Sequence, residues 1–287
     1  NTQFLPIWTL LSIIEFEPGI DIEIIILNNE SKEIETLNFL SSIESKFKTF
    51  FKIKVIDVPG EFNFSKINNL GSKYANGNVL LLLNNDVYFI KKGWGYALAQ
   101  NALRKDIGFV GAKLFFEDMT IQHAGVIMGI NGVAGHSHKF FPNESSGYMK
   151  RLIVSQEFSA LTAACLAIST SKFETLGGFN EKSLKVNYND VDLCLRAKEI
   201  GLKNIFLPEV EAIHLESKSR GKPYGKSLRQ WKRESNYIKK FWYNYIKYDP
   251  FYNKNLSLDN EQYTINTKST KHLEYRLGNF PNYKKLI

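Results

Sequence analysis

Apolar runs typical of strands alternate with amphipathic segments typical of helices through the first part of the chain. The expected strands cover residues 22–27, 53–58, 79–83 and 109–114. The expected helices cover residues 4–16, 32–47, 64–75 and 93–103. These assignments rest on spacing, because strand side chains alternate between two faces and helical ones repeat about every 3.6 residues. The alternation predicts an α/β domain with a largely parallel sheet.

The pattern changes after residue 108. A segment rich in glycine and histidine, 122–138, predicts hairpins and precedes an apolar strand at 165–169. We therefore expect the sheet to become mixed in this region. The remaining expected elements are a helix from Asn189 that stops at Gly201, a strand at 209–214 and an aromatic-rich helix at 231–245.

Polar clusters follow two of the expected strands, at residues 28–31 and 84–86. Both clusters lie at carboxyl ends of strands, where open α/β sheets bind ligands. In the second cluster Asp86 is a candidate ligand for Mg²⁺ or Mn²⁺, because these ions prefer oxygen donors and complete their shell with substrate phosphates. The alternative is that Asn-Asn-Asp is simply a turn.

Acidic and histidine side chains supply the other candidates for chemistry. Asp190 falls in the first turn of an expected helix, where the helix dipole favours the ionised carboxylate. It is therefore a candidate general base, with a capping role as the alternative. Asp192 should point away from Asp190 and support the fold. His214 ends an expected strand and is either structural or a ligand for Mn²⁺. No cysteine or third ligand lies near His136 and His138, so we assign them no metal role.

Composition limits the class of protein. The chain has 287 residues, 44% hydrophobic and 23% charged, which suits a sizeable core and excludes disorder as its main state. Its apolar runs are far shorter than the roughly 20 residues of a membrane-spanning helix. Cys165 and Cys194 cannot form a disulfide framework, and residues 1–10 lack the pattern of a secretory signal. We therefore expect a reducing, cytoplasmic setting.

The formal net charge of +8 indicates an anionic partner, such as nucleic acid, a phospholipid surface or a phosphorylated small molecule. Basic residues concentrate after His214, at Lys218, Arg220, Lys222, Lys226, Arg229, Lys232 and Arg233. Aromatic residues lie close by, at Trp231, Phe241, Trp242 and Tyr243. This combination keeps open a polyanion-binding or nucleic-acid-binding protein, and a solvated loop and helix face is the simpler alternative. The chain has neither a P-loop nor a dinucleotide-binding glycine motif.

Taken in order, a series of segments resembles the inverting family 2 glycosyltransferases of the GT-A fold, in particular the bacterial O-antigen and rhamnosyltransferase-like branch. The segments span nearly the whole chain: IIILNNES (24–31), LLLLNNDV (80–87), QHAGVIMGINGVAGHSH (122–138), LTAACLAI (161–168), GGFNE (177–181), NDVDLCLR (189–196), HLESKSRG (214–221) and DPFYNKNLSLD (249–259). The resemblance implies a GT-A domain over residues 1–248, with a mixed, mostly parallel sheet flanked by helices, and a C-terminal extension over 249–287. The family's first strand normally precedes the turn at residues 1–2, so we expect an N-terminally truncated domain that lacks it.

The resemblance also implies roles for individual residues. Asn28 matches the position that contacts the nucleotide base, and Asp86 matches the last acid of the Asp-x-Asp metal motif. Asp190 matches the catalytic base, and His214 matches a metal-binding histidine. Asn84 replaces the first acid of the metal motif. The implied binders of the sugar nucleotide are Asn28, Asn84, Lys218 and Arg220, with segment 217–225 as a lid over the diphosphate.

By this resemblance the expected function is metal-dependent, inverting transfer of a sugar from a nucleoside-diphosphate sugar to a hydroxyl of a saccharide acceptor. The expected cofactor is Mn²⁺ or Mg²⁺, and the expected setting is synthesis of a bacterial surface polysaccharide, with no nucleic-acid partner. A lipid-linked acceptor at the inner face of the membrane would suit the positive charge. The alternative is a transferase-like domain that binds nucleotide or glycan without activity.

Overall fold

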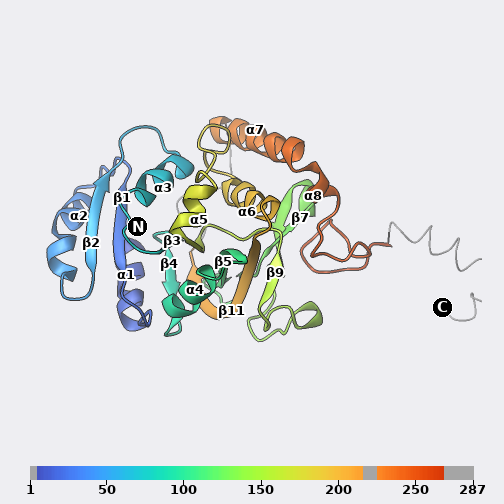
Figure 1. The fold of residues 1–287 in the computed structure, drawn as a ribbon, viewed down its shortest axis with the longest axis horizontal. Helices are drawn as coiled ribbons and strands as arrows, with labels where there is room; N and C mark the ends of the chain where they lie inside the picture. The colour runs from blue at the N-terminus through green and yellow to red at the C-terminus, as the bar shows by residue number, and fades with distance from the viewer. Residues whose placement is uncertain (1–4, 216–224, 268–287) are drawn as a thin grey trace, which may run out of the picture.

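A seven-stranded mixed sheet forms the centre of the molecule in a computed structural model that describes residues 5–215 and 225–267 (Figure 1). Its main path, in order, is β3 (Val79–Leu83), β10 (Cys165–Ser169), β5 (Ile107–Phe115), β11 (Lys203–His214) and β4 (Val87–Phe89). Off this path, β6 (Ile121–His123) pairs with β5, and β9 (Gln156–Phe158) pairs with β11. β5 and β11 are parallel, whereas β10 is antiparallel to both of its neighbours.

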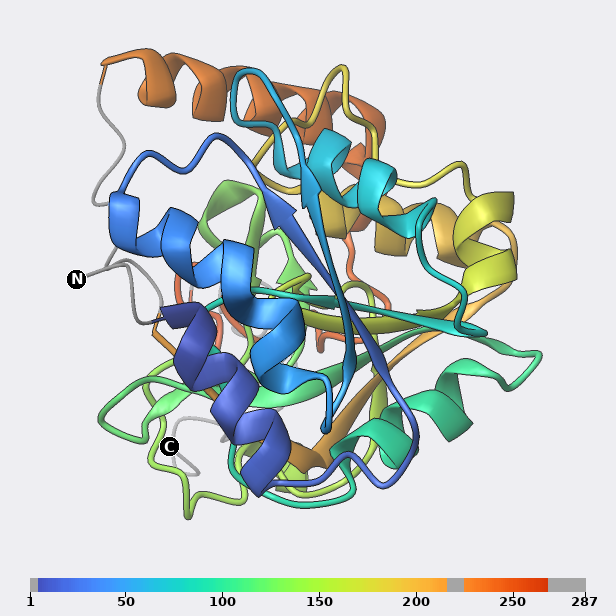
Figure 2. The ribbon, with the colours of Figure 1, turned by 90° about the vertical axis from the view of Figure 1, so that its left-hand side faces the viewer.

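A second, two-stranded parallel sheet lies at one end of the molecule (Figures 1 and 2). It consists of β1 (Glu23–Asn28) and β2 (Lys52–Asp57). Three helices accompany it: α1 (Leu5–Glu15), α2 (Ile34–Phe47) and α3 (Phe64–Ser72). Within the described residues β1 pairs only with β2, and it joins the central sheet through side-chain packing rather than backbone hydrogen bonds.

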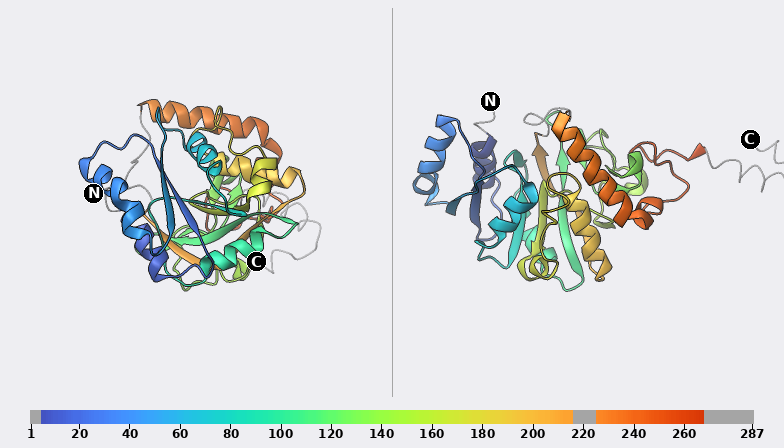
Figure 3. Two further views of the ribbon diagram at one scale, coloured as in Figure 1. Left: turned by 60° about the vertical axis from the view of Figure 1, so that its left-hand side comes forward. Right: turned by 90° about the horizontal axis from the view of Figure 1, so that it is seen from above.

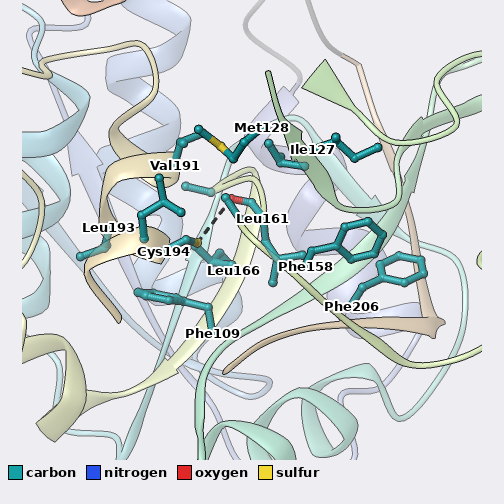
Figure 4. Close-up of a cluster of buried hydrophobic side chains, with 14 of the residues drawn as sticks. Phe109, Ile127, Met128, Phe158, Leu161, Leu166, Val191, Leu193, Cys194 and Phe206 are labelled. Carbon is teal, nitrogen blue, oxygen red and sulfur yellow. Dashed lines mark hydrogen bonds between the residues drawn. The ribbon is translucent and has the colours of Figure 1, made fainter. Parts of the chain in front are cut away.

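Strand alternation gives the central sheet two apolar faces, because successive side chains point to opposite sides. Phe109, Leu166 and Ile168 pack against α6 (Asn189–Glu199) in one cluster, part of which is shown in Figure 4. Val110 and Ala167, one residue along their strands, pack against α4 (Trp94–Ala102) in another cluster. The sheet is therefore buried between helices, which leaves its strand ends to form the site.

The remaining elements extend from the α6 side of the sheet (Figure 3). They are the hairpin of β7 (Val126–Met128) and β8 (Ala134–His136), helices α5 (Thr170–Thr175), α7 (Gly225–Phe241) and α8 (Tyr243–Lys247), and the 3₁₀ turns Ile130–Gly132 and Tyr148–Lys150. Asp249 ties the end of this region to the hairpin, since its carboxylate accepts from the Met128 N–H at 2.7 Å and from the Ser159 hydroxyl at 2.8 Å. The proposed boundary between residues 248 and 249 stays a prediction.

The mixed α/β architecture flanked by helices is confirmed, and two strands begin and end where they were expected, at Val79–Leu83 and Cys165–Ser169. The strand predicted at 209–214 begins earlier, at Lys203, because an irregularity between Leu207 and Glu211 takes Pro208 out of the paired register. The helix predicted at 231–245 is also wrong in its bounds, because α7 starts at Gly225 and a break at Trp242 separates it from α8. Both cysteines are free and buried, as expected. No helix in the described ranges combines the length and apolarity that crossing a bilayer requires.

Candidate active site

The loop between β3 and β4 brings Asn84 and Asp86 against His214. Residue Val87 pairs with His214 across the antiparallel contact of β4 with β11, so Asp86 lies beside the histidine. Oδ1 of Asp86 is 3.2 Å from Nε2 of His214, and Nδ2 of Asn84 is 3.2 Å from the same nitrogen. Asp86 and His214 are each only 8% exposed. Three sequence-predicted residues therefore meet in one buried group.

Gln122, on β6, determines which nitrogen of His214 carries the proton. Its side-chain N–H donates to the backbone oxygen of His214 at 2.9 Å, which turns its Oε1 toward Nδ1 of the ring at 2.7 Å. A carbonyl oxygen only accepts, so the network assigns the proton to Nδ1 and leaves a lone pair on Nε2 in the neutral ring. We call Asn84, Asp86, Gln122 and His214 the cation cluster.

The cation cluster fits a divalent ion. Oδ1 of Asp86 is buried and has no hydrogen-bond partner in the described part of the chain, and it faces the His214 lone pair. Metal-binding histidines typically donate their other N–H to a second group, as His214 does to Gln122. The described residues contain no set of three acidic, histidine or cysteine side chains around one point. An Mg²⁺ or Mn²⁺ ion here would therefore complete its shell with waters and substrate phosphates.

Asp190 is held by backbone groups at the start of α6. Its Oδ1 accepts from the Val191 N–H at 2.8 Å and its Oδ2 accepts from the Ala163 N–H at 3.0 Å. Burial raises the pKa of Asp190, and the bonds from Ala163, Val191 and the Thr162 hydroxyl oppose that rise. The carboxylate is thus more basic than an exposed aspartate, and it remains partly accessible.

Segment 162–164 joins this carboxylate to the cation cluster. The Ala164 backbone oxygen accepts from the Asn84 N–H at 2.9 Å, while the adjacent Ala163 N–H donates to Asp190. Asn84 belongs to the same short loop as Asp86, so the two aspartates flank a single strip of backbone. The structure therefore brings Asp86 and Asp190 to one edge of the central sheet.

Asp190 opens onto a cleft of about 270 Å³, which we call the base cleft. Its walls come from the β7–β8 hairpin, the loop before α6 and one face of α7: Val126, Ala134, Gly135, His136, Val186, Asn187, Tyr188, Asn189, Asp190, Val191 and Trp231. Glu234 on α7 anchors that loop, because its carboxylate accepts from the backbone N–H groups of residues 185–187.

The neighbours of Asp190 are structural. Asn189 is buried and donates to Ser65 Oγ at 3.1 Å. Asp192 points away from the cleft, as expected, and accepts from Arg196 Nε and Trp242 Nε1, each at 2.9 Å. Asp190 is therefore the carboxylate of this helix that faces the base cleft.

The other predicted residues lie apart from this centre or outside the described ranges. Asn28 ends β1 and donates to the Asp57 carboxylate at 2.8 Å, and no hydrogen bond or ion pair in the described chain joins it to Asp86 or Asp190. Lys218, Arg220 and the predicted lid up to residue 224 lie outside the described residues.

Sequence reasoning did not single out Gln122 or give His136 a role. The motif QHAG marks their region, but Gln122 reaches His214 across 92 positions of the chain. Such a contact depends on β6 folding back along β5, which no local pattern specifies.

Comparison with known proteins places the chain in a family. The model of glycosyl transferase family 2 matches residues 8–171. An uncharacterised protein, y4gI, of Sinorhizobium fredii is 38% identical over 85% of this chain and 27% of its own length. The O-antigen biosynthesis protein RfbC of Myxococcus xanthus is 32% identical over 82% of this chain and 18% of its own length. The chain thus spans little more than a quarter of these relatives at most.

Solved structures agree on the architecture. GalNAc-T7 with UDP, GalNAc and Mn²⁺ superposes with a TM-score of 0.62 at 16% identity, over 83% of this chain and 46% of that one. The mannosyltransferase PcManGT of Pyrobaculum calidifontis, with GDP-Man and Mn²⁺, gives a TM-score of 0.55 at 15% identity, over 77% and 55%. With the family model matching more than half of its residues, the chain belongs to glycosyl transferase family 2 and has the GT-A fold.

Proposed function

We propose that this chain catalyses metal-dependent, inverting transfer of a sugar from a nucleoside-diphosphate sugar to a hydroxyl of a saccharide acceptor. The observation that carries the proposal is the placement of Asp86 and Asp190 on either side of segment 162–164. One carboxylate belongs to a group that fits a divalent cation, and the other is an accessible, basic side chain in a cleft. Membership of the transferase family supports the same reaction class.

Each residue has a defined task in this scheme. Asp190 accepts the proton of the acceptor hydroxyl as its oxygen attacks the anomeric carbon, and the bond from that carbon to the diphosphate breaks with its electron pair. Asp86 and His214 hold the cation. When bound, the cation neutralises the charge that develops on the departing diphosphate. Asn28 contacts the nucleotide base, and Asn84, Lys218 and Arg220 help to bind the sugar nucleotide.

The substrate class follows from the relatives and the charge. RfbC is named for O-antigen biosynthesis, which supports a bacterial surface polysaccharide as the product. The net charge of +8 suits a diphosphate donor and an acceptor carried on an anionic membrane lipid.

A panel of UDP-, dTDP- and GDP-sugars, each with and without Mn²⁺, tests the proposal. Release of nucleoside diphosphate that needs both Mn²⁺ and an intact Asp190 is the expected result. Nucleotide binding without turnover of any sugar would contradict catalysis and favour a binding domain. Tight binding of oligonucleotides with a steep salt dependence and no effect of Mn²⁺ would instead favour a polyanion-binding protein.

A further inference from the structure

Two histidines lie beside the base cleft, and the proposed transfer gives neither of them a task. His123 ends β6 and His136 ends β8, and their Nδ1 atoms lie 2.9 Å apart. His136 lines the cleft together with Asp190 and Trp231. Because imidazole is costly to bury without partners, what the pair presents to the cleft determines what the cleft can bind.

Backbone hydrogen bonds assign the protons of this pair. Nε2 of His123 accepts from the Gly125 N–H at 3.3 Å and faces the Thr162 N–H at 3.5 Å. An accepting nitrogen carries no proton, so neutral His123 is protonated on Nδ1 and donates to Nδ1 of His136. The proton of His136 is then on Nε2. No described residue accepts a hydrogen bond from that N–H, which makes it a donor for a bound molecule.

The donor is neutral under ordinary conditions. Burial, reinforced by the positive charge of Lys139 and by His214, lowers the pKa of His136 to about 4. Burial likewise lowers the pKa of His123 well below its usual range. A neutral N–H in a fixed position suits an uncharged oxygen such as a sugar hydroxyl, whereas a phosphate would be bound better by a cation.

Trp231 supplies an apolar surface in the same cleft. Its indole is 36% exposed on α7, and Glu234, one turn further along that helix, ties α7 to the loop that precedes Asp190. The helix and the loop therefore hold a constant relation. An aromatic face beside a few fixed polar groups is typical of sites for small ligands, and the C–H face of a pyranose ring matches an indole.

The cleft lies on the acceptor side of the reaction. Its lining includes Asp190 but none of Asn84, Asp86 or His214. Inversion requires the incoming oxygen and the departing diphosphate to lie on opposite faces of the anomeric carbon. If the diphosphate takes the cation cluster, the acceptor must approach from the base cleft.

We propose that His136 and Trp231 form the binding subsite for a pyranose ring of the saccharide acceptor, with His123 holding His136 in its donating tautomer. This assignment rests on the proposed function for the words "acceptor" and "donor". The existence of a pyranose subsite is testable without any turnover.

Nuclear magnetic resonance of the ¹⁵N-labelled protein tests the subsite directly. The expected tautomers are Nε2–H for His136 and Nδ1–H for His123. Methyl hexopyranosides and methyl 6-deoxyhexopyranosides, added singly, should include at least one that shifts the His136 Nε2 and Trp231 indole signals. The indole groups of Trp94 and Trp242 are internal controls, because they donate to Phe16 and Asp192.

UDP with Mn²⁺ should leave the His136 and Trp231 signals in place. The opposite tautomer of His136 would overturn the proposal. So would the absence of a shift with every glycoside, or shifts caused by UDP and Mn²⁺ alone.

Kinetics test the acceptor role. His136→Leu and Trp231→Ala should each raise the KM for the saccharide acceptor about tenfold, as expected for one lost hydrogen bond or packing contact, with little change in the KM for the nucleotide sugar. His136→Gln places an N–H donor near the original Nε2 and should recover most of the loss. Trp8→Ala is the matched control, since Trp8 is 57% exposed on α1, away from the cleft.

The two proposals fail in different ways. Unchanged acceptor KM in both His136→Leu and Trp231→Ala, in an enzyme that still needs Asp190, would overturn the subsite and leave the proposed function intact. Absence of any turnover in the unaltered protein would remove the proposed function, and the resonance shifts with glycosides would then decide the subsite alone.

Discussion

The cation cluster and the base cleft are built by different means. In the cation cluster, side chains contact side chains, and Gln122 orients His214 toward Asp86. In the base cleft, Asp190 is held mainly by backbone N–H groups that the fold itself supplies. A group of mutually dependent side chains responds to substitution in graded steps, whereas a backbone-held carboxylate keeps its position and is simply present or absent.

The largest effect is expected at Asp190. Asp190→Asn removes the proton acceptor and should lower the transfer rate by about 10²- to 10⁴-fold, the usual contribution of general-base assistance. Binding of the nucleoside diphosphate and Mn²⁺, measured by titration calorimetry, should change little. A variant that retains the original rate would show that the base lies elsewhere and would break the comparison.

Gln122→Leu should have the next largest effect. Without the acceptor at Nδ1, His214 can move its proton to Nε2 and rotate, so the Mn²⁺ affinity should fall about 10- to 100-fold. Electron paramagnetic resonance of free Mn²⁺ measures this in the presence of nucleoside diphosphate. Gln122→Glu keeps an acceptor for Nδ1–H and is the matched control. Equal loss in both variants would mean that Gln122 acts through packing and does not set the tautomer.

Asn84→Asp should strengthen the cation cluster. The amide nitrogen of Asn84 lies 3.2 Å from the His214 lone pair, where a carboxylate oxygen would become a further ligand. Adding one negative ligand should tighten Mn²⁺ binding by roughly tenfold. The same titration measures it, with Asn85→Asp in the same loop as the control for added charge. Weaker binding in Asn84→Asp would place the cation away from Nε2.

The smallest effect concerns pH. Because burial raises the pKa of Asp190 above the ordinary value of 3.8, kcat/KM should fall on acidification at a pH above that value, as the base takes up a proton. Thr162→Val removes a hydroxyl that stabilises the carboxylate, so the acid limb should move to still higher pH, by less than about one unit. A shift to lower pH would contradict the assignment of that limb to Asp190.

Sequence reasoning worked where a local pattern carried the information. The apolar run before Asn84 and the acidic first turn of α6 placed Asp86 at a strand end and Asp190 at a helix start, as the structure has them. It was less accurate where long-range contacts decide the outcome. β4 has three residues, too few for a periodic signal, and it forms because β11 offers a partner edge.

What the sequence determined by itself is the order of strands and helices, the strand-end position of Asp86 and the helix-start position of Asp190. These depend on spacing and on the chemistry of single turns. Only the tertiary structure decided that the two carboxylates share segment 162–164, that Gln122 holds His214, and that His123 aims His136 at the base cleft. The physical reason is that a hydrogen bond depends on the positions of both partners, and here most partners are brought together by sheet pairing between segments far apart in the chain.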